Sequence, residues 1–167
     1  MDGVIQKKLL ARRVVVLYGA IDSNMAERVI NDLVTLVFED PQKDIILLVD
    51  SNGGSAEESF RLYDYIRVLP NKVIGIVLGN CRSAAFVILQ ACNEKFSTEN
   101  SIFLMHDVSA SISYKSGDTL IDLQEKIAIR HARTKEIEKQ IITIFCKASG
   151  LSEEQLHDLE KRGEYSD

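Results

Sequence analysis

A serine at a strand–helix junction is the first residue of this sequence that could do chemistry. Ser83 follows 72–78, an apolar run of strand length, and precedes 84–92, which is apolar and compatible with a helix. A hydroxyl in such a turn lies at the carboxyl end of a strand, with the following N–H groups turned toward whatever it attacks. Ser83 is therefore a candidate nucleophile, although serine here is also a common helix N-cap.

Paired glycines upstream could complete such a site. Gly53 and Gly54 follow a strand one βα unit before Ser83, so the two turns can be neighbours at one edge of a sheet. Paired glycines let the backbone approach a substrate and can present an N–H to a developing oxyanion. A Gly-Gly turn by itself is more often only a tight connection.

One histidine lies where it could serve as a base. His106 directly follows the extended segment 102–105, so it also stands at the carboxyl end of a strand. Histidine in that position is a candidate general base for a serine nucleophile. His131 and His157 lie in charged helical contexts and are expected at the surface.

The elements around these residues alternate in type. The pattern β-α-β-α-β-α-β-β predicts an α/β fold with a mostly parallel sheet and ligands at the carboxyl ends of its strands. A capping box at 24–27 should open the first helix, and Ser55 with Glu58 the second. The strand at 44–50 has no polar alternation and is expected to be covered on both faces. The predicted strands are 14–18 (ended by Gly19), 44–50, 72–78, 94–97 and 102–105.

A long amphipathic helix follows a Ser-rich stretch at 107–119, which is expected to be an exposed loop or irregular strand. The helix should span 120–148 and end at Gly150. At 1.5 Å per residue it would be about 43 Å long, more than one small domain can cover. It is therefore expected to pack on a partner. Its apolar side is Leu123, Ile127, Ile137, Ile141, Ile144 and Phe145.

Composition excludes several classes of protein. With 167 residues and 46% apolar content, one domain with a real core is expected. The net charge of −5 gives no footprint for nucleic acid, and no segment predicts a signal peptide or membrane span. Cys81, Cys92 and Cys146 are expected to be reduced thiols of a cytoplasmic protein, with no metal or cofactor site. The basic segment 7–13 is expected to be solvated surface.

Three short segments resemble the proteolytic subunit of the Clp protease, a serine peptidase family of the crotonase-like superfamily. Residues 50–55 resemble that family's Asn-Ser-Pro-Gly-Gly turn, 79–86 its nucleophile segment, and 104–106 its Met-Ile-His. The similarity extends from about Leu9 to the region of Arg162. It implies that Ser83 is the nucleophile and His106 the base, with the backbone N–H groups of Gly54 and Ala84 forming the oxyanion hole.

The resemblance also implies an organisation and partners. Residues 1–167 would form one peptidase domain, with 1–106 and 150–167 as the head and 107–149 as a handle by which two heptameric rings stack. Such a particle degrades unfolded polypeptides in its chamber and works with an AAA+ unfoldase.

The sequence departs from the family at several positions. Asn52 replaces the family's Pro and Ala84 its Met, and Gly163 stands where the triad Asp is expected. Asp107, Asp158, Glu164 or Asp167 could substitute for that acid. A weakly active or non-catalytic paralogue in a mixed ring is therefore an alternative. A peptidase with a Ser-Lys pair is a further alternative, and Lys72 and Lys95 are the only lysines near Ser83 in sequence. A crotonase relative that handles acyl-CoA is the least favoured of these functions.

Overall fold

The computed structural model describes residues 3–106, 108 and 116–163, and the chain divides into two compact units, Met1–Met105 and His106–Asp167. The boundary falls within a residue of the expected start of the handle. The assignment of residues 150–167 to the head stays a prediction.

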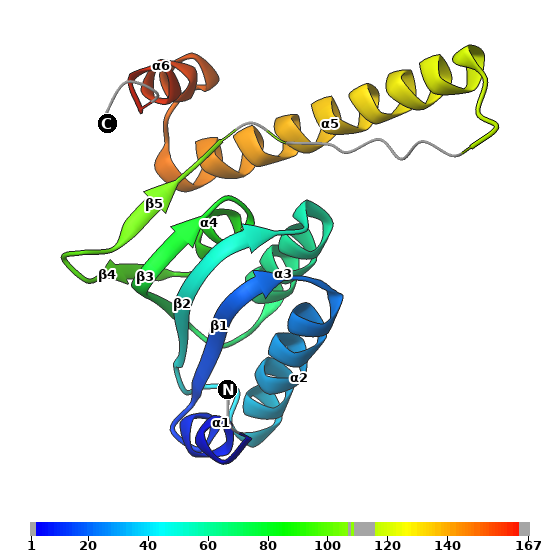
Figure 1. The fold of residues 1–167 in the computed structure, drawn as a ribbon. Helices are drawn as coiled ribbons and strands as arrows, with labels where there is room; N and C mark the ends of the chain where they lie inside the picture. Colours follow the sequence, from blue (N-terminus) through cyan, green and yellow to red (C-terminus); the bar gives the residue numbers. More distant parts are fainter. Residues whose placement is uncertain (1–2, 107, 109–115, 164–167) are drawn as a thin grey trace. The chain divides into compact units, whose positions relative to one another are not determined.

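The first unit is built on a parallel sheet, as the alternating pattern predicts. Its order is β1-β2-β3-β4, and β5 pairs with the later part of β3. All four pairings among the described strands are parallel. The carboxyl ends of β1, β2 and β3 therefore meet at one edge (Figure 1). The strands are β1 (Val14–Ile21), β2 (Ile45–Gly54), β3 (Val73–Arg82), β4 (Glu94–Ser97) and β5 (Ile102–Leu104).

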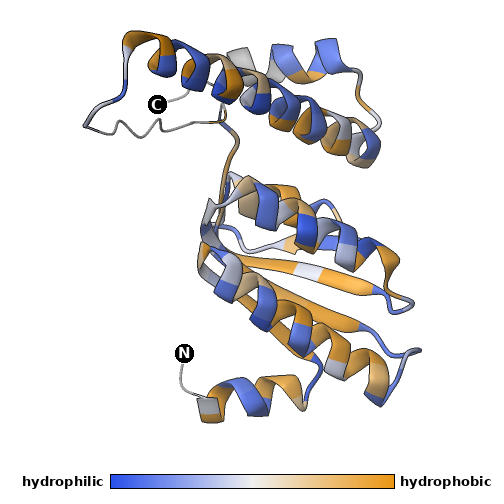
Figure 2. Ribbon diagram, turned by 90° about the vertical axis from the view of Figure 1, so that its right-hand side faces the viewer, coloured by the Kyte–Doolittle hydropathy of each residue, from blue (hydrophilic) through white to orange (hydrophobic). Residues whose placement is uncertain are grey.

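Helices cover one face of this sheet. Helices α2 (Ser23–Glu39), α3 (Ala56–Val68) and α4 (Ala84–Leu89) lie together in front of the strands in Figure 2. The strand side chains on that face form the core. Along β2, buried side chains on that face alternate with half-buried side chains on the opposite face. The expectation that 44–50 is covered on both faces is therefore wrong within this chain, because Ile46 and Leu48 point away from the helices and are only half-buried.

The start of α3 agrees with the sequence prediction, whereas the start of α2 differs from it. Ser55 caps α3 and accepts a hydrogen bond from the N–H of Glu58 at 3.3 Å. Helix α2 begins earlier than the capping box at 24–27 predicts, because the carboxylate of Asp22 accepts the N–H of Met25 at 2.8 Å. The sequence reading also missed α1 (Gly3–Leu10), a short helix before the first strand.

The strands run further than their apolar runs predict. Strand β1 continues through Gly19, whose φ of +88° lets the chain pass a register shift between Tyr18 and Ala20. Strand β2 likewise continues to Gly54, and β3 reaches Arg82. The longer strands carry the Gly-Gly turn and the serine junction to adjacent positions on the sheet edge.

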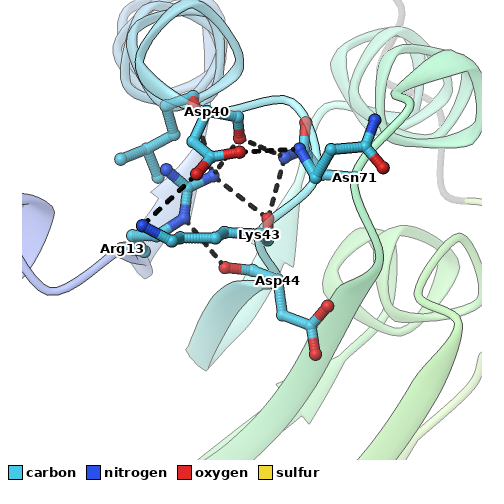
Figure 3. Close-up of polar contacts among 7 residues, drawn as sticks. Arg13, Asp40, Lys43, Asp44 and Asn71 are labelled. Carbon is cyan, nitrogen blue, oxygen red and sulfur yellow. Dashed lines mark hydrogen bonds and ion pairs between the residues drawn. The ribbon is translucent and has the colours of Figure 1, made fainter.

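Arg13 corrects the expectation that segment 7–13 is only solvated surface. Its guanidinium donates to the carbonyl oxygens of Leu36, Asp40, Lys43 and Asp44 at 3.0 to 3.1 Å (Figure 3). The side chain of Asn71 also donates to the carbonyls of Asp40 and Lys43 at 2.9 and 2.8 Å. The connection between α2 and β2 is therefore held by residues that lie just before β1 and just before β3.

The described part of the second unit contains two helices. Helix α5 (Leu120–Ser149) agrees with the predicted long helix, opens on a capping box between Thr119 and Asp122, and ends at Gly150 with φ +75°. Helix α6 (Glu153–Gly163) follows it. Most of the stretch 107–119 lies outside the described residues. Of the predicted apolar side of α5, Ile137, Ile144 and Phe145 are buried within this chain, whereas Ile127 is exposed.

Candidate active site

Ser83 has an unusual backbone conformation. Its φ of 51° and ψ of −123° lie outside the regions that non-glycine residues normally occupy. Its side chain makes no capping hydrogen bond to α4, so the interpretation as an ordinary N-cap is not supported. Its own N–H donates to the carbonyl of Leu104 in β5 at 2.7 Å. The hydroxyl therefore does not cap α4, which leaves it for chemistry at the strand–helix junction.

The Gly-Gly turn lies directly against this junction, which confirms that the two turns are neighbours. A Cβ added to Gly53 would be 2.8 Å from both the carbonyl oxygen of Arg82 and the Cβ of Ser83, and 3.0 Å from the backbone nitrogen of Ala84. Gly53 has φ +95°. Only glycine fits both the conformation and the space, so the backbone of β2 can approach the nucleophile closely.

Gly54 is fixed by β1 rather than by the nucleophile turn. An added Cβ would collide with the carbonyl oxygen of Ile21 and come within 2.8 Å of its nitrogen. The N–H that bonds to that carbonyl belongs to Ser55, at 2.8 Å. The N–H of Gly53 bonds to the hydroxyl of Ser51 at 3.0 Å. Neither contact uses the N–H of Gly54.

Ser51 is a residue of this site that sequence reasoning missed. Its hydroxyl donates to the carbonyl of Gly19 at 2.6 Å while accepting the N–H of Gly53. It is a buried polar residue in a mostly apolar core. Its only sequence signal is its place just before the glycines, and a serine there gives no indication that its side chain reaches the preceding strand.

The elements behind the nucleophile are apolar and well packed. Ala84 and Ala85 are buried at the start of α4. The ring of Phe86 lies against that of Phe103 from β5, with centroids 5.5 Å apart. On β2, Asp50 accepts the backbone N–H of Asn80 at 2.8 Å, which ties β2 to β3 just before the junction. The rigid backing holds Ser83 in its strained conformation.

The two cysteines of the first unit are weaker candidates for the nucleophile than Ser83. Burial raises the pKa of Cys81 and of Cys92 to about 12 each. Both thiols therefore stay protonated at neutral pH, and a protonated thiol is a weak nucleophile. Cys81, although two residues before Ser83, acts as part of the core.

All three histidines are exposed, as the sequence predicts for His131 and His157. His131 is exposed on α5, and His157 is exposed on α6 with its Nε2 3.9 Å from a carboxylate oxygen of Glu153. His106 is exposed and is the first residue of the second unit. In sequence it stands two residues after Leu104, the acceptor of the Ser83 N–H. The pairing of His106 with Ser83 stays a prediction.

The two lysines of the Ser-Lys alternative lie at the wrong end of the sheet. Lys72 pairs with Glu94 at 2.6 Å, and the ammonium of Lys95 donates to the carbonyl of Cys92 at 3.0 Å. Lys95 is opposite Gly75 in the ladder, eight residues before Ser83, which corresponds to about 26 Å along a strand. Neither lysine can take a proton from Ser83.

The acid of the predicted triad is not assigned. Gly163 is the last residue of α6, and Asp158 is exposed on the same helix. Asp107, Glu164 and Asp167 lie outside the described residues. Within the described part of the chain, no cluster of His, Cys, Asp and Glu could hold a metal ion. Nor does any helix in that part have the length and apolarity to cross a bilayer.

Known proteins resemble this chain over most of its length. A sequence model described as Clp protease matches residues 3–166. The ATP-dependent Clp protease proteolytic subunit 3 of Rhodococcus jostii is 31% identical over 155 residues, which are 92% of this chain and 73% of that protein. The proteolytic subunit 1 of Streptomyces avermitilis is 32% identical over 157 residues, covering 93% and 69% of the two chains.

Proposed function

The chain belongs to the Clp protease family and is a serine-type peptidase, and we propose that Ser83 is its nucleophile and His106 its general base. The backbone N–H groups of Gly54 and Ala84 would form the oxyanion hole. The observation that carries this assignment is the strained backbone of Ser83 at a strand–helix junction, with the Gly53 backbone packed against it. No other described serine combines these two features.

The proposed reaction is peptide hydrolysis through an acyl-enzyme. The Oγ of Ser83 attacks the substrate carbonyl carbon, and His106 accepts the hydroxyl proton. Negative charge then develops on the carbonyl oxygen, which the two N–H groups stabilise. His106 returns the proton to the leaving amine as the C–N bond breaks. A water molecule, deprotonated by the same histidine, hydrolyses the ester and regenerates Ser83.

The local geometry supports Gly54 and Ala84 as the two donors. The N–H of Gly53 is already bonded to Ser51, so the next N–H along the turn is the better candidate on that side. Ala84 is the first residue of α4, where an N–H has no partner within its own helix. The close approach of Gly53 to the Ala84 nitrogen brings the two turns to one place on the sheet edge.

The proposed assembly follows from the family. We propose that the chain forms two stacked heptameric rings, degrades unfolded polypeptides in the chamber between them, and works with an AAA+ unfoldase in the cytoplasm. The relatives are named as subunits of an ATP-dependent protease. The exposed apolar side chains on the first half of α5 support this proposal, because a partner would remove them from water.

One observation favours a second candidate. Gly163 stands where the resemblance places the triad acid, and glycine has no carboxylate to orient His106. Loss of that acid costs about 10⁴ in rate in a well-studied triad. The alternative function is therefore a weakly active or non-catalytic paralogue that builds or regulates a mixed ring.

Labelling with a fluorophosphonate tests the proposal directly. The wild-type protein should form a stoichiometric adduct at Ser83, located by mass spectrometry, and Ser83→Ala should abolish both the adduct and peptide hydrolysis. The control is Ser97→Ala, which removes an exposed hydroxyl at the end of β4 and should keep both. Unchanged hydrolysis by Ser83→Ala would exclude Ser83 as the nucleophile, and an assembled wild type without adduct or hydrolysis would favour the paralogue.

A further inference from the structure

We propose that Ser51 is a positioning residue that holds the Gly53–Gly54 turn in the conformation that the oxyanion hole needs. The inference deepens the function proposed above and rests on it. Ser51 makes no direct contact with substrate in this scheme. It acts through the turn, by fixing where the N–H of Gly54 points.

The ladder between β1 and β2 is interrupted next to Ser51. Tyr18 pairs with Asp50 and Ala20 pairs with Gly53, so one residue of β1 faces two of β2. The extra residue disrupts the regular backbone hydrogen bonds at this bulge. Ser51 lies inside it, and its hydroxyl joins the carbonyl of Gly19 at 2.6 Å to the N–H of Gly53 at 3.0 Å. The side chain replaces the backbone bonds that the bulge removes.

The Ser51 hydroxyl restrains a turn that is made of two glycines. Gly53 and Gly54 have φ values of +95° and +156°, and glycine gives the backbone more freedom than any other residue. Asn52, between Ser51 and the glycines, is exposed. The Ser51 hydroxyl therefore adds a side-chain restraint to this glycine backbone. It is 2% exposed, so water cannot easily take its place.

The glycine turn lies in contact with the nucleophile junction. The Gly53 backbone packs against Ser83 and Ala84, and the N–H of Gly54 follows it immediately. A shift of less than 1 Å at Gly53 would move the Gly54 donor relative to Ala84. Oxyanion stabilisation depends on donors held in advance at about 2.7–3.1 Å from the oxygen, and misplacement by 1 Å can cost about 100-fold in rate. Ser51 should therefore affect the transition state more than substrate binding.

The main test compares Ser51→Ala with Ser59→Ala in the assembled protein. Ser59 is an equally buried serine, 0% exposed, whose hydroxyl donates to the carbonyl of Ala56 within α3 at 2.7 Å. Both variants lose one buried hydroxyl, so both should lose some thermal stability. On a fluorogenic peptide, Ser51→Ala should lower kcat about 10- to 100-fold with KM within about twofold of wild type. Ser59→Ala should keep kcat within about twofold.

A second measurement separates positioning from a general loss of structure. A peptide aldehyde forms a tetrahedral adduct with the nucleophile and so uses the oxyanion hole, whereas the corresponding peptide alcohol has no carbonyl and cannot form that adduct. Ser51→Ala should weaken binding of the aldehyde by a factor close to its loss in kcat and leave binding of the peptide alcohol within about twofold. Ser51→Thr, which keeps a hydroxyl, should recover most of the activity, and Ser51→Cys, with a weaker donor, should lie between.

The outcomes distinguish this inference from the function on which it rests. Equal kcat for Ser51→Ala and Ser59→Ala, or equal weakening of the aldehyde and the peptide alcohol, would overturn the role of Ser51 while Ser83 still labels with fluorophosphonate. If Ser83→Ala keeps full hydrolysis, the proposed function itself fails, whatever Ser51 does.

Discussion

At the scale of single residues, the nucleophile turn keeps a strained conformation because its neighbours determine it. A non-glycine residue in a sparsely populated region costs about 1–3 kcal/mol. Ser83 is held on one side by the bond from its N–H to Leu104, and on the other by its carbonyl, which accepts the N–H of Phe86 at 2.9 Å. The backbone of Gly53 also packs closely against Ser83. The strain thus supports a function rather than the fold, because an ordinary N-cap would avoid it.

The substitution Gly163→Asp tests whether a carboxylate at this position completes the predicted triad. If the carboxylate reaches the Nδ1 of His106, it would favour the tautomer that accepts the Ser83 proton and would stabilise the imidazolium. Peptidase activity should then rise, by up to the roughly 10⁴-fold that the acid contributes in an established triad. Steady-state hydrolysis of a fluorogenic peptide measures the effect.

The control for this experiment is Gly163→Ala. Gly163 lies at the end of α6, and both substitutions change the backbone preference there, but only Asp adds a charge. No more turnover from Asp than from Ala, in particles of equal mass, would mean that another carboxylate orients His106 or that the site is not a triad.

At the scale of elements, the connection between α2 and β2 is held by side chains from outside it. Arg13 directly precedes β1, has φ 60°, and donates to four carbonyls between residues 36 and 44. The carboxylate of Asp40 is also bonded there, and its hydrogen bonds with the N–H of Gln42 and with Lys43 lower its pKa. These contacts fix where β2 begins, and therefore its register with β1.

Arg13→Ala should destabilise the fold by about 2–3 kcal/mol, because hydrogen bonds from a charged group contribute about 1.5–3 kcal/mol and several carbonyls lose their partner together. Urea unfolding at neutral pH measures the change. Arg12→Ala is the matched control, since Arg12 makes one exposed bond to the carbonyl of Lys8 at 3.3 Å and should change stability by less than about 0.5 kcal/mol. Equal destabilisation by the two variants would contradict this role of Arg13.

At the scale of the whole molecule, helix α5 gives the best reason to expect an oligomer. Its 30 residues correspond to about 45 Å, and its first half carries exposed apolar side chains, among them Leu120 at 80% and Ile127 at 47%. These two residues are seven apart and lie on one face of the helix. An apolar face left in water favours association, and a symmetric oligomer can bury it.

The double variant Leu120→Gln/Ile127→Gln should therefore divide a double-ring particle into single rings, with about half the sedimentation mass. The polar side chains keep helix propensity but remove the apolar contact. Arg130→Gln, an exposed change on the same helix, is the control and should leave the mass unchanged. If the double variant keeps the wild-type mass, these residues do not form the ring contact.

Local patterns in the sequence determined the parallel α/β fold, the long helix and the serine junction, because hydrophobic periodicity and the chain breaks at Gly and Pro act over short distances. They also indicated that the Gly-Gly turn and Ser83 share one sheet edge. The pairing of Ser83 with His106 and the identity of the acid remain predictions.

Only the tertiary structure determined the long-range contacts of Ser51 and Arg13 and the limits of the strands. The role of Ser51 depends on a carbonyl 32 residues away, and that of Arg13 on carbonyls 23 to 31 residues away. Strand limits also changed, because the ladders continue through Gly19 and on to Gly54 where the apolar pattern stops. Such contacts have no local signal, since each forms only when the packed sheet brings distant backbone groups within hydrogen-bonding distance.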